Sequence, residues 1–211
     1  MSAPTDHRTL VLHGVRIKGF ASPEVVAEAV GLPEVLTAEI LGDLVQEGLV
    51  TDRYESIPGF SITPEGRREH ARLVAAELER ADARGPLIDA YRRFREHNGG
   101  LVSLSSQWQV REVDGRLVVN DHDDPAYDRA IIDRLVVHHG RATPVLADLA
   151  LTLDRYGPYQ PRLDHAMERV TAGDTDWFTK PMIPSYHTIW FELHEDLLAT
   201  LGIERGQEEL V

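Results

Sequence analysis

The residues best suited to chemistry lie near the C-terminus, where histidine and aromatic side chains recur. His187, Trp190 and His194 follow one another at spacings of three, four and seven residues, so a helix would place them on one face. Tyr186 adjoins this stripe, and Trp177 precedes it across two prolines. Such a stripe most often packs a core or a dimer interface. The sharper hypothesis is a pocket for a small aromatic or planar ligand.

On the pocket hypothesis, Trp108, Trp177 and Trp190 form the walls, and His187 or His194 supplies hydrogen bonds. The two histidines lie two helical turns apart, about 10 Å along the axis, which is too far for both to bind one metal ion. We therefore expect a ligand pocket without a metal at this stripe.

A second group of chemically capable residues spans 120–128, where four aspartates and a histidine occur. They could hold a hard cation or supply a general base. The spacing lacks the fixed glycine and the final glutamate of a calcium loop. Capping of a helix by Asp123 or Asp124 before Pro125 explains most of the pattern. His138 and His139 before Gly140 are likewise interpreted as residues at a helix end.

Several enzyme classes are excluded or disfavoured by what the sequence lacks. The absence of cysteine excludes disulfides, thiolate chemistry and cysteine-ligated metal centres. No nucleotide-binding glycine loop, nucleophile elbow or zinc-protease motif occurs. We expect no cofactor and favour a role other than catalysis. An enzyme whose residues come together only in the fold stays open.

The charge of the chain opposes binding to nucleic acid at long range. The net charge is −13, and it is spread over the chain, with −5 on residues 1–84 and −8 on residues 85–211. Any contact with DNA would need a local basic patch. No apolar run approaches the roughly 20 residues of a spanning helix, and no leader pattern opens the chain, so we expect a cytoplasmic protein without a membrane contact.

The N-terminal part predicts helices and a short hairpin after a disordered segment of residues 1–7. A hydroxyl cap, a proline and an acid at Ser22, Pro23 and Glu24 indicate a helix start that Gly31 closes. Leu36, Ile40, Leu41 and Leu44 then share one face of the next helix. The expected elements are helices at 9–20, 23–30, 33–47 and 64–83, with strands at 49–54 and 59–62 joined through residues 55–58.

This order of elements resembles a known class of protein. It resembles the winged helix-turn-helix of multiple-antibiotic-resistance (MarR) type transcriptional regulators. Two motifs next to the predicted strands carry the resemblance: Gly48-Leu49-Val50 and Ile62-Thr63-Pro64-Glu65-Gly66-Arg67. The whole chain is also similar to uncharacterised actinomycete winged-helix proteins. The resemblance implies a mainly α fold with a small β-wing: a winged helix-turn-helix domain over residues 8–84 and a helical domain for ligand binding and dimerisation over residues 85–211.

The second half predicts mostly helix. Arg84-Gly85-Pro86 is the expected domain boundary, and Asp114-Gly115 is a favourable two-residue hairpin turn between strands. Asn98-Gly99-Gly100 and Gly140 are expected to end helices, and Thr143-Pro144 to begin one. The expected helices run from 87 to 98, 125 to 139, 144 to 156, 161 to 172 and 185 to 201. The expected strands run from 107 to 113 and 116 to 119, and a helix through Trp108 is the alternative at the start of the first strand.

The helix that would read DNA carries the wrong charge. Between Pro33 and Glu47 there is no Lys or Arg, whereas Glu34, Glu39 and Asp43 fall on its solvent face. Acids can accept from cytosine amino groups, but beside cations that neutralise phosphate. The candidate DNA contacts are therefore Thr37 on this helix and the neighbouring basic residues: Arg16, Lys18, Arg53, Arg67 and Arg68.

Two functional hypotheses follow. The leading one is a ligand-responsive transcriptional regulator, a homodimer that binds duplex DNA and takes a small aromatic ligand in its second half. The alternative is a winged-helix-derived protein that no longer binds DNA because of its acidic helix, and that acts as an enzyme or the partner of an enzyme in small-molecule metabolism.

Overall fold

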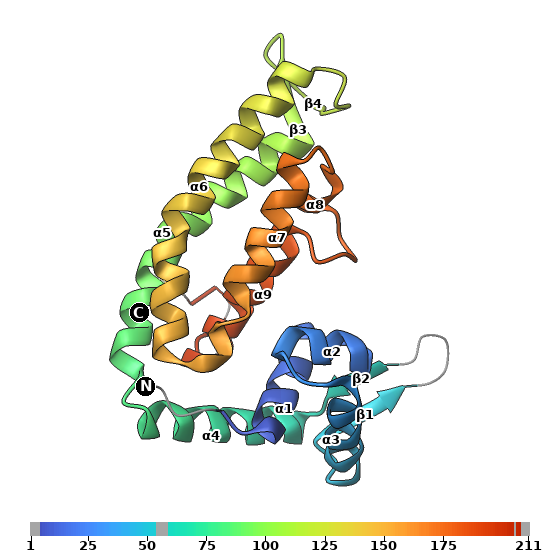
Figure 1. Cartoon of the computed structure of the whole chain (residues 1–211), viewed down its shortest axis with the longest axis vertical. Helices are drawn as coiled ribbons and strands as arrows, with labels where there is room; N and C mark the ends of the chain where they lie inside the picture. The colour runs from blue at the N-terminus through green and yellow to red at the C-terminus, as the bar shows by residue number, and fades with distance from the viewer. Residues whose placement is uncertain (1–4, 54–58, 205, 208–211) are drawn as a thin grey trace. The chain divides into compact units, whose positions relative to one another are not determined.

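The structure of the chain is a computed structural model that describes residues 5–53, 59–204 and 206–207. This part is mainly helical, with nine α-helices and two antiparallel sheets of two strands each (Figure 1). The predicted connection at residues 55–58, Tyr54 before it, and residues 1–4 of the segment expected to be disordered lie outside the described residues. Thr5 of that segment is buried and donates a hydrogen bond to Glu77.

The N-terminal elements follow the predicted order with small shifts in their ends. In the first sheet two strands pair in an antiparallel arrangement, with Thr51 opposite Ser61. The elements are α1 (His7–Lys18), α2 (Pro23–Val30), α3 (Glu34–Gln46), β1 (Val50–Arg53), β2 (Gly59–Ile62) and α4 (Pro64–Arg80).

The later elements depart further from the predictions. They are α5 (Arg84–Gln109), β3 (Val110–Val113), β4 (Arg116–Val119), α6 (Pro125–Thr152), the 3-10 turn η1 (Asp154–Tyr156), α7 (Tyr159–Thr171), α8 (Asp176–Thr179) and α9 (Tyr186–Leu201). The turn η1 and the helix α8 were not predicted.

The chain forms two compact units. The first unit groups the described parts of residues 1–88, 150–158 and 192–211, and the second unit groups residues 89–149 and 159–191. The sequence analysis placed residues 85–211 in one domain, whereas two later segments of the chain group with the N-terminal residues.

The core of the first unit forms where the sequence pattern placed it. Leu41 and Leu44 of α3 are fully buried and Ile40 packs against them, while α1 contributes Val11 and Leu12. Gly31 ends α2 in the left-handed conformation, with a φ of 70°. The predicted start of α2 at Pro23 and the apolar face of α3 are thus confirmed, but Ser22 makes no side-chain capping hydrogen bond.

A close backbone approach explains the glycine that follows Thr63-Pro64-Glu65. The Thr63 hydroxyl caps α4 by accepting from Gly66 N at 2.9 Å, and Thr63 N donates to Leu49 O at 3.0 Å. A Cβ on Gly66 would lie 2.0 Å from Leu49 O, inside the contact distance of any atom pair. The start of α4 is therefore pressed against the chain that enters β1, and only glycine fits there.

The two long helices overturn two predicted helix ends and one predicted helix start. α5 continues through Asn98-Gly99-Gly100, and α6 continues through Gly140 and Pro144. Thr143 donates its hydroxyl to His139 O instead of capping a new helix. A glycine costs a helix only about 1 kcal/mol relative to alanine, and a proline in the helix interior costs about 3 kcal/mol. The buried faces of α5 and α6 on both sides of these residues outweigh that cost.

The second hairpin confirms the prediction at its turn. Asp114 and Gly115 have φ values of 50° and 75°, as a tight two-residue hairpin turn requires. β3 starts only at Val110, later than the predicted residue 107, because α5 extends to Gln109, as the alternative of a helix through Trp108 predicted. No helix in the described part of the chain combines the length and apolar character needed to cross a bilayer.

We expect Gly66→Ala to destabilise the chain by about 3 kcal/mol, because the new methyl group overlaps the Leu49 carbonyl. The matched control is Gly42→Ala on the exposed side of α3, where a Cβ meets nothing within 4 Å and helix propensity predicts a gain of about 1 kcal/mol. Urea unfolding followed by circular dichroism measures both. Equal effects of the two variants would contradict the close approach.

Candidate functional site

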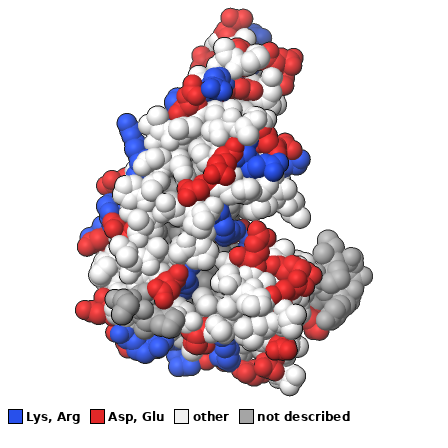
Figure 2. All heavy atoms as spheres, in the orientation of Figure 1, with Lys and Arg blue, Asp and Glu red and all other residues white. Residues whose placement is uncertain are grey.

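The exposed face of α3 is acidic. Glu34, Glu39 and Asp43 are exposed, as the sequence predicted, and Val35 beside them is 73% exposed. Figure 2 shows Asp and Glu atoms over α2 and α3 and Lys and Arg atoms along α4. Hydrogen bonds that include one from Ser22 lower the pKa of Glu24 on α2, so this neighbouring carboxyl is also ionised.

Three of the residues predicted to contact DNA offer no polar group for that contact in the described structure. Two of them are already bonded within the chain, and the side chain of the third is not described. Thr37 is fully buried and its hydroxyl donates to Pro33 O at 3.1 Å, so its assignment as a DNA contact is corrected. The Lys18 ammonium is bound by Glu192. Arg53 ends β1, and its side chain lies outside the described structure.

The remaining predicted contacts form a weak basic surface. Arg16 is half-buried, and both its burial and the nearby charge of Arg67 lower the pKa of its guanidinium. Arg67 itself is exposed. Arg68 is also exposed, but it is paired with Glu65 one turn away. Arg16 and Arg67 are therefore the pair that could approach a phosphate backbone.

The aromatic residues predicted to line one pocket separate into different packing groups. Tyr186 and Trp190 are buried in the second unit, their rings 6.3 Å apart, and Trp190 stacks on Phe94 at 4.7 Å. The Trp190 indole donates to Asn98 Oδ1 at 3.0 Å. These contacts match the alternative interpretation of the stripe, in which it packs a core.

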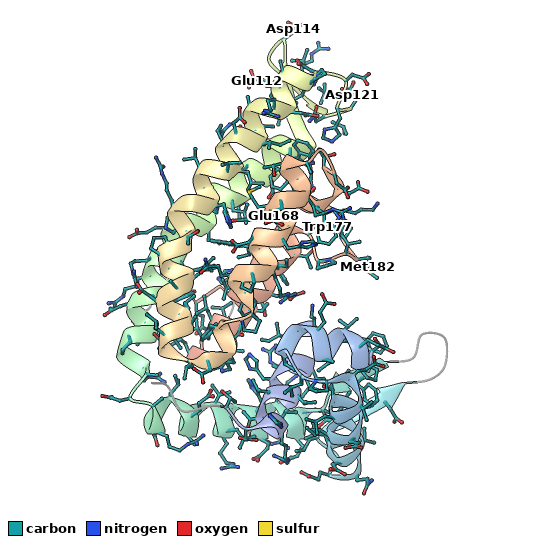
Figure 3. The ribbon with its side chains drawn as sticks, in the orientation of Figure 1. Glu112, Asp114, Asp121, Glu168, Trp177 and Met182 are labelled. Atoms are coloured by element: carbon teal, nitrogen blue, oxygen red, sulfur yellow. The ribbon has the colours of Figure 1, made fainter. Side chains whose placement is uncertain are left out.

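The other members of the predicted pocket lie elsewhere. Trp108 is buried against Phe178, with their ring centres 5.2 Å apart. Trp177 is half-buried on α8, in the segment after α7 (Figure 3), and His187 is exposed. His194 is buried and belongs to the first unit. The six residues therefore do not line one common pocket.

The acidic segment before α6 is a helix cap. Asp124 accepts from the backbone N–H groups of Ala126 and Tyr127, both at 3.1 Å, which confirms the capping interpretation. His122 Nδ1 lies 2.9 Å from Asp128 Oδ2, so these two side chains satisfy one another. Across the described residues, no group of three or more His, Asp or Glu side chains is placed to hold a metal ion.

A buried polar network in the first unit is the main feature that sequence reasoning missed. Arg155 of η1 donates from Nε to Glu77 Oε2 at 3.0 Å, from Nη1 to Asp196 Oδ1 at 2.9 Å, and from Nη2 to Thr200 Oγ1 at 2.9 Å. Arg155 is 8% exposed, and its three partners are buried further. Burial alone would lower the pKa of Arg155, but the surrounding Tyr156, Asp196 and Glu77 raise it.

Two histidines complete the network. His13 Nε2 lies 3.0 Å from Asp196 Oδ2, and His13 Nδ1 shares a hydrogen bond of 2.9 Å with His70 Nε2. Burial and the nearby charges of His13 and Arg155 lower the pKa of His70 to about 2, so its ring is neutral at neutral pH. The network joins α1, α4, η1 and α9, and its burial leaves a substrate no access. We interpret it as structural.

The second unit contains a cleft between α5 and α6, which we call the α5–α6 cleft. Its volume is about 340 Å³. His138 on its wall is buried and donates from Nε2 to His97 O at 3.0 Å, and burial lowers the pKa of His138. The expectation that His138 and His139 mark a helix end is wrong because α6 continues beyond them. The lining residues are Glu96, His97, Gly100, Leu104, Arg134, Val137, His138 and Arg141.

The sequence contained a pattern that fits this cleft, but it was interpreted as helix ends. The lining residues recur at helical spacing on each helix, for example Arg134, His138 and Arg141 on α6. Gly100 was interpreted as a helix end. The sequence therefore did not predict that Gly100 and Leu104 share one face of α5. Comparison of the chain with models of protein families, with curated proteins and with solved structures found no match.

We expect stability to fall as the pH drops below about 6.5, because the unfolded chain then protonates His70 whereas the folded chain does not. His70 faces His13 and Arg16 on α1, Arg155 on η1 and Asp196 on α9. The loss from this one residue approaches about 2 kcal/mol at pH 5. Urea unfolding at a series of pH values measures the slope.

His70→Gln should flatten that slope, because the side chain no longer titrates. His7→Gln, at an exposed histidine of α1, is the matched control and should keep it. An unchanged slope in His70→Gln would show that the pH dependence arises elsewhere.

Proposed function

We propose that the chain is a winged helix-turn-helix protein that docks a basic protein surface through α3 and does not read duplex DNA with that helix. The order α1, α2, α3, β1, β2 and α4, with the β1–β2 hairpin as the wing, supports the winged-helix assignment. The proposal keeps the predicted architecture. Of the two functional hypotheses it selects the second, a winged-helix-derived protein that no longer binds DNA, and assigns it the role of a partner of another protein.

The acidic exposed face of α3 carries the proposal. Glu34, Glu39 and Asp43 project from the surface that a reading helix turns toward the major groove. Duplex DNA carries one negative charge per about 1.7 Å of its axis, so each carboxylate on this face would meet repulsion. A partner surface rich in Lys and Arg gains from the same charges.

The shape of the same face suits a protein partner. Val35, Ala38 and Gly42 follow one another at spacings of three and four residues, all of them exposed, and Glu39 and Asp43 flank them. The short side chains let a partner helix approach closely, and the exposed valine offers it an apolar contact. A basic amphipathic helix is the partner segment that fits best.

A second candidate is the DNA-binding regulator, and one observation favours it. Arg16 and Arg67, which come from α1 and α4, lie close enough for their charges to interact. Such a pair could contact phosphates without help from α3. We rank this candidate second because the neighbouring Lys18 and Arg68 are already paired with acids.

The predicted homodimer also stays part of the proposal, and the β3–β4 hairpin supports it. Leu117 and Val119 are 77% and 78% exposed. Their partners on the neighbouring strand, Glu112 and Val110, face the same side, so this face is apolar at three of its four positions. Figure 3 shows Glu112 and Asp114 at this hairpin. A hairpin of two strands is at best marginally stable alone, and an apolar face of this kind is usually covered by a partner. We infer that a second copy of the chain covers it.

The central test is the binding of fluorescent duplex DNA at low salt, measured by anisotropy. We expect the unaltered chain to show no specific binding. Glu39→Lys with Asp43→Lys should create salt-dependent binding, because the change removes two repulsive charges and adds two cations. The matched control is Asp123→Lys with Glu168→Lys, which changes the net charge equally at exposed residues of the second unit.

The same variants test the docking surface. A basic amphipathic peptide should bind the unaltered chain, and Glu39→Gln with Asp43→Gln should weaken that binding by about tenfold. Tight binding of duplex by the unaltered chain, reduced by Arg67→Ala, would reject docking in favour of the regulator.

Leu117→Lys with Val119→Lys should convert the homodimer to a monomer, because two cations would enter the apolar contact. Light scattering coupled to gel filtration measures the mass. Val118→Lys, on the opposite face of the same strand, is the control and should leave the dimer intact. A monomeric unaltered chain would contradict the proposal.

A further inference from the structure

We propose that the α5–α6 cleft binds a small organic monoanion, with a carboxylate held by Arg134 and Arg141 and a flat apolar body against the adjoining wall. This inference concerns the second unit alone and does not rest on the docking role of α3. It assigns to the chain a ligand site and a chemical class of ligand.

The arginines of the cleft differ from others on the same two helices. Outside the cleft, Arg93 pairs with Asp148 at 2.7 Å and Arg129 pairs with Asp133 at 3.3 Å. In the cleft, Arg134 bonds the neutral Gln107 Oε1 at 2.8 Å.

Arg141 differs in the same way. It has no acidic partner within 4 Å among the residues that the structure describes. Two guanidinium groups without carboxylate partners on one helix face are suited to hold an anion, since charge-assisted bonds from Arg to a carboxylate are among the strongest in proteins.

The charge balance of the cleft selects a single negative charge. Arg134 and Arg141 bring two positive charges, and Glu96 brings one negative charge. His138 adds none, because its buried ring is neutral while Nε2 donates to the His97 carbonyl. A dianion would place its second charge near Glu96, and a cation would meet both arginines.

The walls select a flat and partly apolar body. Leu104 and Val137 supply apolar contact, and the His138 ring is a rigid flat surface, fixed by its bond to His97. The volume of about 340 Å³ lies at the lower end of the range for ligand pockets, which runs from about 300 to 1,000 Å³. The ligand is therefore small.

Gly100 leaves the cleft open at this point of α5. It lies inside the helix, where glycine costs about 1 kcal/mol relative to alanine, and no positive φ requires it. A Cβ at this position would meet His138 Cδ2 at 3.5 Å, an ordinary contact distance, so alanine would fit. A larger side chain would extend into the cleft that Gly100 lines.

Trp190 gives the cleft a built-in reporter. The ring of His138 lies edge-on to the Trp190 indole, with ring centres 5.2 Å apart. A ligand that presses on the wall at His138 changes the surroundings of this indole. Its indole N–H signal in a two-dimensional NMR spectrum therefore reports occupancy of the cleft.

The test is an NMR titration of the full chain with phenylacetate, with the neutral isostere 2-phenylethanol and with inorganic phosphate. We expect phenylacetate alone to shift the Trp190 indole and the amides of the cleft in a saturable manner. Arg141→Gln and Arg134→Gln should each weaken its binding by about tenfold or more, the loss expected for a hydrogen bond to a charged group. Arg129→Gln, on the same helix but outside the cleft, is the matched control.

Gly100→Leu should abolish the shifts by filling the cleft while raising helix propensity, so a loss of binding would not reflect a loss of folding. Circular dichroism of each variant checks the helix content. Equal binding of phenylacetate and 2-phenylethanol, preference for phosphate, no saturable binding of any probe, or unchanged affinity in Arg141→Gln would overturn the proposal.

Discussion

The first unit depends on one buried guanidinium. Arg155 lies among Glu77, Asp196 and Thr200 and donates to all three, so the turn that carries it is fixed to α4 and α9. Removing one partner of such a buried pair typically costs about 3 to 5 kcal/mol, because the remaining charge is left uncompensated. This interaction makes segments far along the sequence part of the N-terminal unit, and it holds α1 through His13.

The same chemistry limits what the surface of the first unit can do. Cations that a nucleic-acid-binding unit would present are neutralised instead: Lys18 pairs with Glu192, and Arg68 with Glu65. The exposed face of α3 adds carboxylates and no cation. A rigid unit with an acidic, small-residue helix on its surface is better suited to a basic protein partner than to a phosphate backbone. The second unit, by contrast, keeps two arginines without acidic partners in its cleft.

The sequence predicted what local chemistry determines. Thr63 and Asp124 cap helices, Asp114-Gly115 forms the hairpin turn, and the acids of α3 face solvent. It failed where distant packing decides, since α5 and α6 continue through Gly99-Gly100 and Pro144. The Arg155 network could not be predicted, because its members lie 41 to 142 residues from Arg155 and none forms a recognisable motif with it. The aromatic stripe was visible, but its spacing could not distinguish core packing from a pocket.

The most direct test of the account is to map the contact surface of α3 residue by residue. Two-dimensional NMR of the labelled chain would be recorded with a basic amphipathic peptide and, separately, with duplex DNA at low salt. The account predicts that the peptide shifts the amides of Val35, Ala38 and Gly42 and that the duplex leaves them unchanged. Shifts of the same amides by the duplex, with none from the peptide, would contradict it and restore α3 as a DNA-reading helix.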